Sequence, residues 1–129
     1  MKGYITNIEK ETINNTDYRR VLYTAKNSQL VLMNLQPGEE IGEELHTLDQ
    51  FIRLEQGEAT VVLNKEETYS VSADYAIVIP AGVWHNIINS GDKELKLYTV
   101  YSPPEHRDGV VQKTKIDEVE EHFDGKTTE

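Results

Sequence analysis

The chain has 129 residues, of which 37% are hydrophobic and none is cysteine. This length fits one domain with one core, and the lack of cysteine excludes disulfides and thiolate metal sites. The formal net charge of −10 argues against nucleic acid and anionic membranes as partners, because both attract basic surfaces. We find no secretory signal at the N-terminus and no apolar run near the ~20 residues of a membrane helix. These features predict a cytoplasmic protein.

Segments rich in β-forming residues follow one another along the chain, separated by glycine, proline or polar turns. Residues 19–25 and 29–35 flank the polar turn at 26–28 and predict a hairpin, and residues 36–42 predict a loop. The further expected strands are residues 51–57, 58–64, 68–72, 75–80, 84–89 and 95–102. Strands at near-regular spacing predict an all-β sandwich or barrel, and no linker divides residues 1–129, so we expect one domain.

Two segments differ from the alternating strand pattern. Residues 75–80 are a nearly continuous apolar run, which is typical of a strand buried on both faces. Residues 113–123 predict a short C-terminal helix, since Ile116, Val119 and Phe123 recur at helical spacing. This helix belongs to an acidic C-terminus, residues 113–129, whose charges are those of a solvated face and tail.

Four polar side chains fall where separated strands could bring them together. Glu44 and His46 are two residues apart, so they share a face if this stretch is extended. Gln50 returns to the same face in the following strand. His85 comes much later, directly after a proline–glycine turn that leads into another strand. Inside a barrel these four side chains could converge.

Imidazole and carboxylate groups are the usual protein ligands of divalent zinc, iron and manganese when thiolate is absent. Two histidines and one carboxylate leave open positions for water or a substrate, as in a catalytic metal site. Glu44 is the anionic ligand of this set, and Gln50 is a weaker neutral ligand or a hydrogen-bonding support. The alternative is that the histidines are ordinary surface residues and that Glu44 is exposed with the acidic residues around it.

Two stretches together resemble the paired motifs of the cupin superfamily. Residues 38–57 resemble the first motif, with Gly38, Glu44, His46, Gln50 and Gly57 at its key positions. Residues 74–89 resemble the second motif, with Asp74, Pro80, Gly82, His85 and Asn89 at its key positions. The 16 residues between Gly57 and Asp74 lie within the family's usual range. The resemblance covers about residues 19–101.

The resemblance implies a double-stranded β-helix, or jelly-roll barrel, that commonly pairs as a homodimer. It also implies that Glu44, His46, Gln50 and His85 are the metal-ligand positions. Glu44 stands where the family has its first histidine, and Gln50 stands where the family has a glutamate. One carboxylate is therefore retained but moved across the site. Mannose-6-phosphate isomerases of the superfamily mix glutamine, glutamate and two histidines around zinc in a similar way. Asp74 replaces a turn glycine, which aspartate tolerates.

The first functional hypothesis is a metal-dependent enzyme that acts on a small sugar-like or enediol substrate by Lewis-acid chemistry, such as isomerisation. The second is a non-catalytic cupin that binds a small molecule, and a metal-dependent dioxygenase is a further alternative. A degenerate cupin with an empty polar pocket is the remaining one.

Three side chains outside the motifs also carry expectations. Of the strand residues Tyr98 and Tyr101, one faces inward and the other outward, because their positions differ in parity. His106 follows two prolines, which predicts a surface loop, although this segment could instead close over the barrel mouth.

Overall fold

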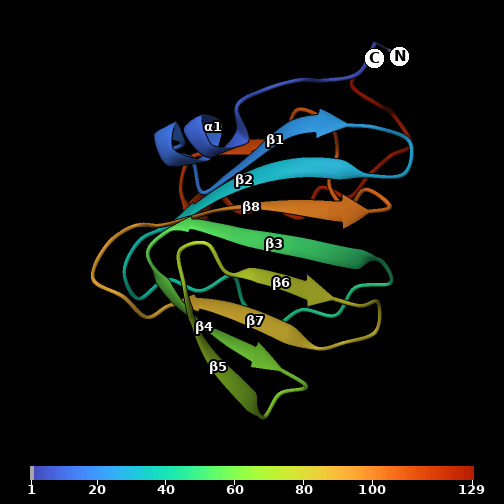
Figure 1. The fold of residues 1–129 in the computed structure, drawn as a ribbon. Coiled ribbons are helices and arrows are strands. Elements are labelled where there is room, and N and C mark those ends of the chain that lie inside the picture. The colour runs from blue at the N-terminus through green and yellow to red at the C-terminus, as the bar shows by residue number, and fades with distance from the viewer. Residues whose placement is uncertain (1) are drawn as a thin grey trace.

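The computed structural model describes residues 2–129, which form two antiparallel β-sheets facing one another (Figure 1). The larger sheet has six strands in the order β6-β3-β8-β2-β1-β9, and the smaller has three in the order β5-β4-β7. The elements are α1 (Ile8–Asn14), β1 (Arg19–Thr24), β2 (Gln29–Leu35), β3 (Asp49–Gln56), β4 (Glu58–Leu63), β5 (Glu67–Ser72), β6 (Ala76–Ile79), β7 (His85–Asn89), β8 (Leu95–Ser102), β9 (Val111–Gln112) and the 3-10 turn η1 (Lys115–Asp117). None of the helices in this part of the chain is long and apolar enough to span a membrane.

The core fills the space between the two sheets and confirms the expected all-β barrel. Residues alternate along β3, so that Gln50, Ile52 and Leu54 are buried while Phe51 and Arg53 lie on the outer side. Every strand expected from the sequence is present, with bounds that differ by at most a few residues.

Strand β6 corrects the expectation that residues 75–80 are buried on both faces. Ile77 and Ile79 enter the core, but Val78 on the opposite face is 66% exposed and Tyr75 is exposed as well. The physical reason is position: within residues 2–129, β6 is an edge strand that pairs only with β3, and no other element covers its outer face. A continuous apolar run therefore marked a strand with one buried face, not two.

The expected C-terminal helix over residues 113–123 is reduced to the single 3-10 turn η1. Ile116 is 95% exposed and Val119 is exposed too, so no apolar face is buried to support further turns. After η1 the chain is extended and joins residues 105–112: Gln112 Nε2 donates to Val119 O at 2.9 Å, and Phe123 N donates to Glu105 O at 2.9 Å. We refer to residues 118–123 as the covering segment.

Helix α1 was not expected, because it has no apolar periodicity. Asn7 caps it by accepting a hydrogen bond from Lys10 N at 3.1 Å, and Glu9 and Glu11 in the first turn suit the helix dipole. Its buried residue is Thr12, a polar side chain whose hydroxyl bonds to Ile8 O. Local capping and contacts with β2, β3 and β8 stabilise this helix.

Candidate metal centre

The segment before β3 runs antiparallel to the start of β7, and this places Glu44 beside His85. Glu44 N donates to His85 O at 2.8 Å, and His85 N donates to Glu44 O at 3.0 Å. Two residues further on, His46 O accepts a hydrogen bond from Gly82 N at 2.9 Å. Residues 44–46 thus form a short extended stretch on the edge of the smaller sheet. This pairing brings the two sequence motifs together.

The side chains of Glu44, His46 and His85 form a compact cluster, with one ligand atom of each within 4.8 Å of the others. Val83 O lies 3.0 Å from His85 Nδ1, and because a carbonyl only accepts, Nδ1 carries the proton and Nε2 has a free lone pair. His46 Nε2 is buried and lies 2.8 Å from Glu44 Oε2, so the imidazole and the carboxylate form an ion-pair contact. One carboxylate and two imidazoles that converge in this way suit a bound divalent cation, which would take the place of the proton between His46 and Glu44.

The charge states of the cluster also suit a divalent ion. Burial opposes ionisation of Glu44, but the neighbouring His46, Arg19 and His85 more than offset it and lower the pKa of this carboxyl. Burial lowers the pKa of His85, which favours the neutral imidazole that binds metals. Burial acts the same way on His46, yet the Glu44 and Glu105 carboxylates raise the pKa of His46 overall. Glu44 therefore supplies the anionic ligand of the set.

Gln50 lies on the inner face of β3, as its parity predicts. Its Nε2 donates to Thr99 Oγ1 at 3.1 Å, which fixes the orientation of the amide. Its Oε1 is buried and has no hydrogen-bond partner among residues 2–129. An unpaired buried carbonyl oxygen is costly, so this atom suits a neutral metal ligand or a support for one. That role stays a prediction.

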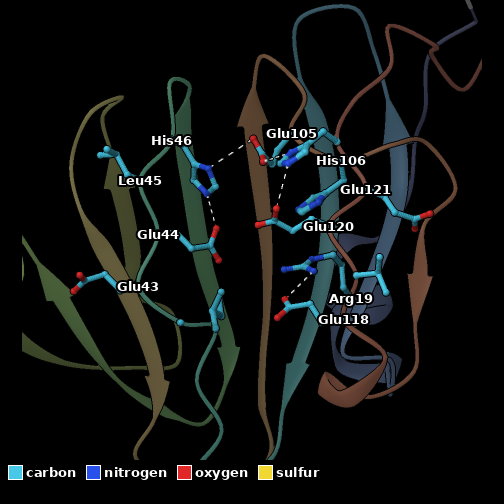
Figure 2. Close-up of a pocket in the computed structure, with 14 residues that line it drawn as sticks. Arg19, Glu43, Glu44, Leu45, His46, Glu105, His106, Glu118, Glu120 and Glu121 are labelled. Atoms are coloured by element: carbon cyan, nitrogen blue, oxygen red, sulfur yellow. Dashed lines mark hydrogen bonds and ion pairs between the residues drawn. The ribbon is translucent and has the colours of Figure 1, made fainter.

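A cavity of about 460 Å³ opens beside the cluster and extends under the covering segment. Figure 2 shows Glu44 and His46 on one wall, with Arg19, Glu105 and His106 on the other. Glu105 Oε2 lies 3.6 Å from His46 Nδ1, an ion-pair contact that steadies the imidazole ring from the side opposite Glu44. Neither Arg19 nor Glu105 was predicted from the sequence to line a site. Arg19 could have been found from strand parity, because it is a charged residue on the same face of β1 as the apolar Val21, which is buried.

His106 lines this cavity and its Nε2 is buried, so the ring does not lie on an open surface loop as expected; closure of this segment over the barrel mouth stays a prediction. The buried Gln29 side chain bonds to the backbone C=O and N–H of His106. Gln29 Nε2 donates to His106 O at 2.7 Å, and His106 N donates to Gln29 Oε1 at 3.0 Å. The ring meets Tyr101 edge-on, with centroids 5.0 Å apart. Its Nε2 is buried, and no group in the described part of the chain forms a hydrogen bond with it. Tyr101 is the inward-facing tyrosine, and Tyr98 lies on the other face.

We expect His106 to make the protein less stable in acid. Burial, with smaller contributions from Arg19, His46 and His122, lowers the pKa of His106 from 6.5 to about 3. Below pH 6.5 the unfolded chain therefore binds a proton that the native state does not, and stability falls by up to about 1.4 kcal/mol per pH unit. In chelator-treated protein, His106→Gln removes this slope between pH 6.5 and about 3, as measured by urea unfolding at several pH values.

The matched control is His122→Gln, since the His122 side chain is 66% exposed. Only the change in unfolding free energy with pH is compared, because His106→Gln also alters packing at every pH. Equal pH dependence in the wild type and in His106→Gln contradicts the expectation.

Comparison with known proteins identifies the family. A family model described as "Cupin domain" matches residues 31–101. The chain belongs to the cupin family. The uncharacterized protein YrkC of Bacillus subtilis (strain 168) is 45% identical to this cupin over 124 residues, which cover 92% of this chain and 67% of YrkC.

Solved structures support the same fold. The crystal structure of BH2720 from Bacillus halodurans superposes on this cupin with a TM-score of 0.87 and 45% identity, covering 90% of this chain and 92% of that one. A Klebsiella pneumoniae protein with a double-stranded β-helix domain superposes with a TM-score of 0.68, covering 79% of this chain and 91% of its own. Its identity of 22% supports the fold alone.

Proposed function

We propose that this cupin binds one divalent metal ion, such as zinc, iron or manganese, through Glu44, His46 and His85, and uses it to bind and activate a small oxygenated molecule. The observation that carries the proposal is the convergence of Glu44, His46 and His85, each of which brings one ligand atom to within 4.8 Å of the other two.

A divalent ion at this position supplies Lewis-acid polarisation of a carbonyl or hydroxyl oxygen. Within the chain, we assign proton movement to the carboxylate of Glu105, because it lies on the cavity wall and contacts His122 at the edge of the cavity. Its Oε1 is 3.2 Å from Nδ1 of His122, which reaches solvent. This pair connects the cavity with bulk water without a large movement of the chain. Isomerisation of an enediol-forming substrate requires only these groups.

A non-catalytic cupin that holds the same small molecule is the second candidate. Its supporting observation is His106, whose pKa of about 3 makes it a poor proton acceptor near neutral pH although it lies in the cavity. In this function His106 contributes a neutral hydrogen-bonding group. The homodimer that the cupin resemblance implies stays a prediction.

The metal content of protein purified without added metal tests the proposal. We expect about one zinc, iron or manganese ion per chain by elemental analysis, since a site with two histidines and one carboxylate retains divalent metals. Chelation should lower the midpoint of thermal unfolding, because a ligand that binds only the folded state stabilises it, and adding the metal back should restore it.

The identity of the metal separates the chemical alternatives. Zinc supports redox-neutral Lewis-acid chemistry, whereas iron or manganese leaves a dioxygenase open as well. The proposal is contradicted if the protein is purified metal-free and none of the three ions changes its unfolding temperature.

A further inference from the structure

Arg19 is a buried cation on the cavity wall, away from the proposed metal ligands. It begins β1 and points inward, with a side chain that is only 6% exposed. Its neighbour Arg20 points outward, with a side chain that is 51% exposed. Figure 2 shows the guanidinium group of Arg19 directed into the cavity, across from Glu44. A buried arginine needs acceptors for its five N–H groups.

The chain satisfies the Arg19 guanidinium only in part. Nη1 donates to Gln112 Oε1 at 2.8 Å and to Glu118 Oε2 at 3.1 Å. Nε is buried without a partner, and Nη2 donates to no residue between 2 and 129. Half of a planar, charged fork is therefore left for an acceptor that the protein does not provide. The strongest complement of such a fork is a carboxylate.

The contact with Glu118 shows that a carboxylate fits against this guanidinium. Glu118 belongs to the covering segment, and its Oε2 also accepts a hydrogen bond from Tyr18 OH at 3.1 Å. Lys115 Nζ lies 3.4 Å from its Oε1. Donor groups of Arg19, Tyr18 and Lys115 therefore surround this position of the cavity wall, and they already bind the carboxylate of Glu118.

The charge balance of the cavity favours one further negative charge. With a divalent ion bound, the ion and Arg19 carry three positive charges against the two negative charges of Glu44 and Glu118, while Lys115 and Glu105 add one of each sign. Two carboxylates at the edge of the cavity have cationic partners, since Glu43 pairs with Lys65 and Glu121 with Arg107. The side chain of Glu120 is 85% exposed, so solvent screens its charge. A monoanion neutralises the remaining charge.

We propose that Arg19 binds the carboxylate of a small monocarboxylic acid in the cavity. A second oxygen atom of this acid, from a hydroxyl or carbonyl group, would bind the metal ion held by Glu44, His46 and His85. This second contact rests on the proposed metal function. A neutral sugar can accept hydrogen bonds from Arg19 but brings no negative charge to balance the guanidinium, and a dianionic phosphate overcompensates the charge next to Glu118. The ligand class is therefore narrower than the sugar-like molecules expected from the sequence.

The test compares small hydroxy acids with their uncharged amides. The probes are 3-hydroxypropanoate and 4-hydroxybutanoate, each paired with its amide, and binding is measured by calorimetry on zinc-loaded and on metal-free protein. We expect at least one acid to bind about tenfold or more tightly than its amide, since a charge-assisted hydrogen bond to a buried guanidinium contributes that much. Measuring metal-free protein separates failure of this proposal from failure of metal binding.

Two variants and one control locate the effect. Arg19→Gln should remove the preference for the acid, whereas Arg20→Gln, the same change on the outer face of the same strand, should leave it unchanged. Glu118→Gln should strengthen binding of the acid about threefold or more without affecting the amide, because it removes a competing negative charge. This second variant keeps Arg19 in place and serves if Arg19→Gln does not fold, as judged by circular dichroism.

Three results would each overturn the proposal. In the first, each acid binds no better than its amide, both in the wild type and in Glu118→Gln. In the second, folded Arg19→Gln keeps the preference for the acid. In the third, none of the four probes binds at millimolar concentration to either form of the protein.

Discussion

Replacing His46 or His85 with alanine is expected to lower the affinity for a divalent metal ion by more than about a hundredfold. Loss of a group that only supports a metal ligand costs about 10- to 100-fold in affinity, and loss of a ligand itself should cost more. Each histidine contributes one ring nitrogen to the cluster with Glu44, so either substitution leaves only two of the three ligand groups. Competition with a chromogenic zinc chelator measures the affinity directly.

The control for these variants is His122→Ala, which removes an exposed imidazole from the rim of the same cavity. It should bind zinc like the wild type. If His46→Ala and His122→Ala retain metal equally well, the metal is held elsewhere. Circular dichroism of the metal-free variants shows whether any loss of affinity reflects unfolding.

Replacing Gly57 with alanine is expected to cost about 2–5 kcal/mol of unfolding free energy. Gly57 ends the first cupin motif with a φ of 96°, a left-handed conformation that an L-residue adopts only with strain. An added Cβ would also lie 2.9 Å from Glu94 O and 3.2 Å from Leu95 Cα. Both are backbone atoms at the start of β8, so no side-chain rotation relieves the contact. Guanidinium unfolding of metal-free protein measures the loss.

Gly38→Ala separates the two causes of this destabilisation. Gly38 also has a positive φ, 84°, but no atom lies within 4 Å of its added Cβ. Only the conformational cost applies there, about 1–2 kcal/mol. Equal losses at the two glycines would show that the close approach to β8 has no energetic consequence, contrary to our expectation.

The strands could be predicted from the sequence because each has its own alternating pattern and is followed by a turn with recognisable residues. The second motif was also predictable, and Asp74 indeed adopts the turn conformation of the glycine it replaces, with a φ of 74°. The pattern failed where burial depends on neighbours. Edge strand β6 has the apolar sequence of a central strand, and residues 113–123 have helical spacing but nothing to pack against.

The sequence by itself determined the barrel and the residues that form the candidate metal cluster. The reason is that strand parity and motif spacing are local properties, so Glu44, His46, Gln50 and His85 could be assigned to the interior before any contact was known. Only the tertiary structure decided what faces this cluster. Arg19 and His106 are separated from it by many residues, and they reach the cavity because β1 lies in the larger sheet and Gln29 holds the chain at residue 106. Such long-range placement follows from packing and buried hydrogen bonds, which no local pattern encodes.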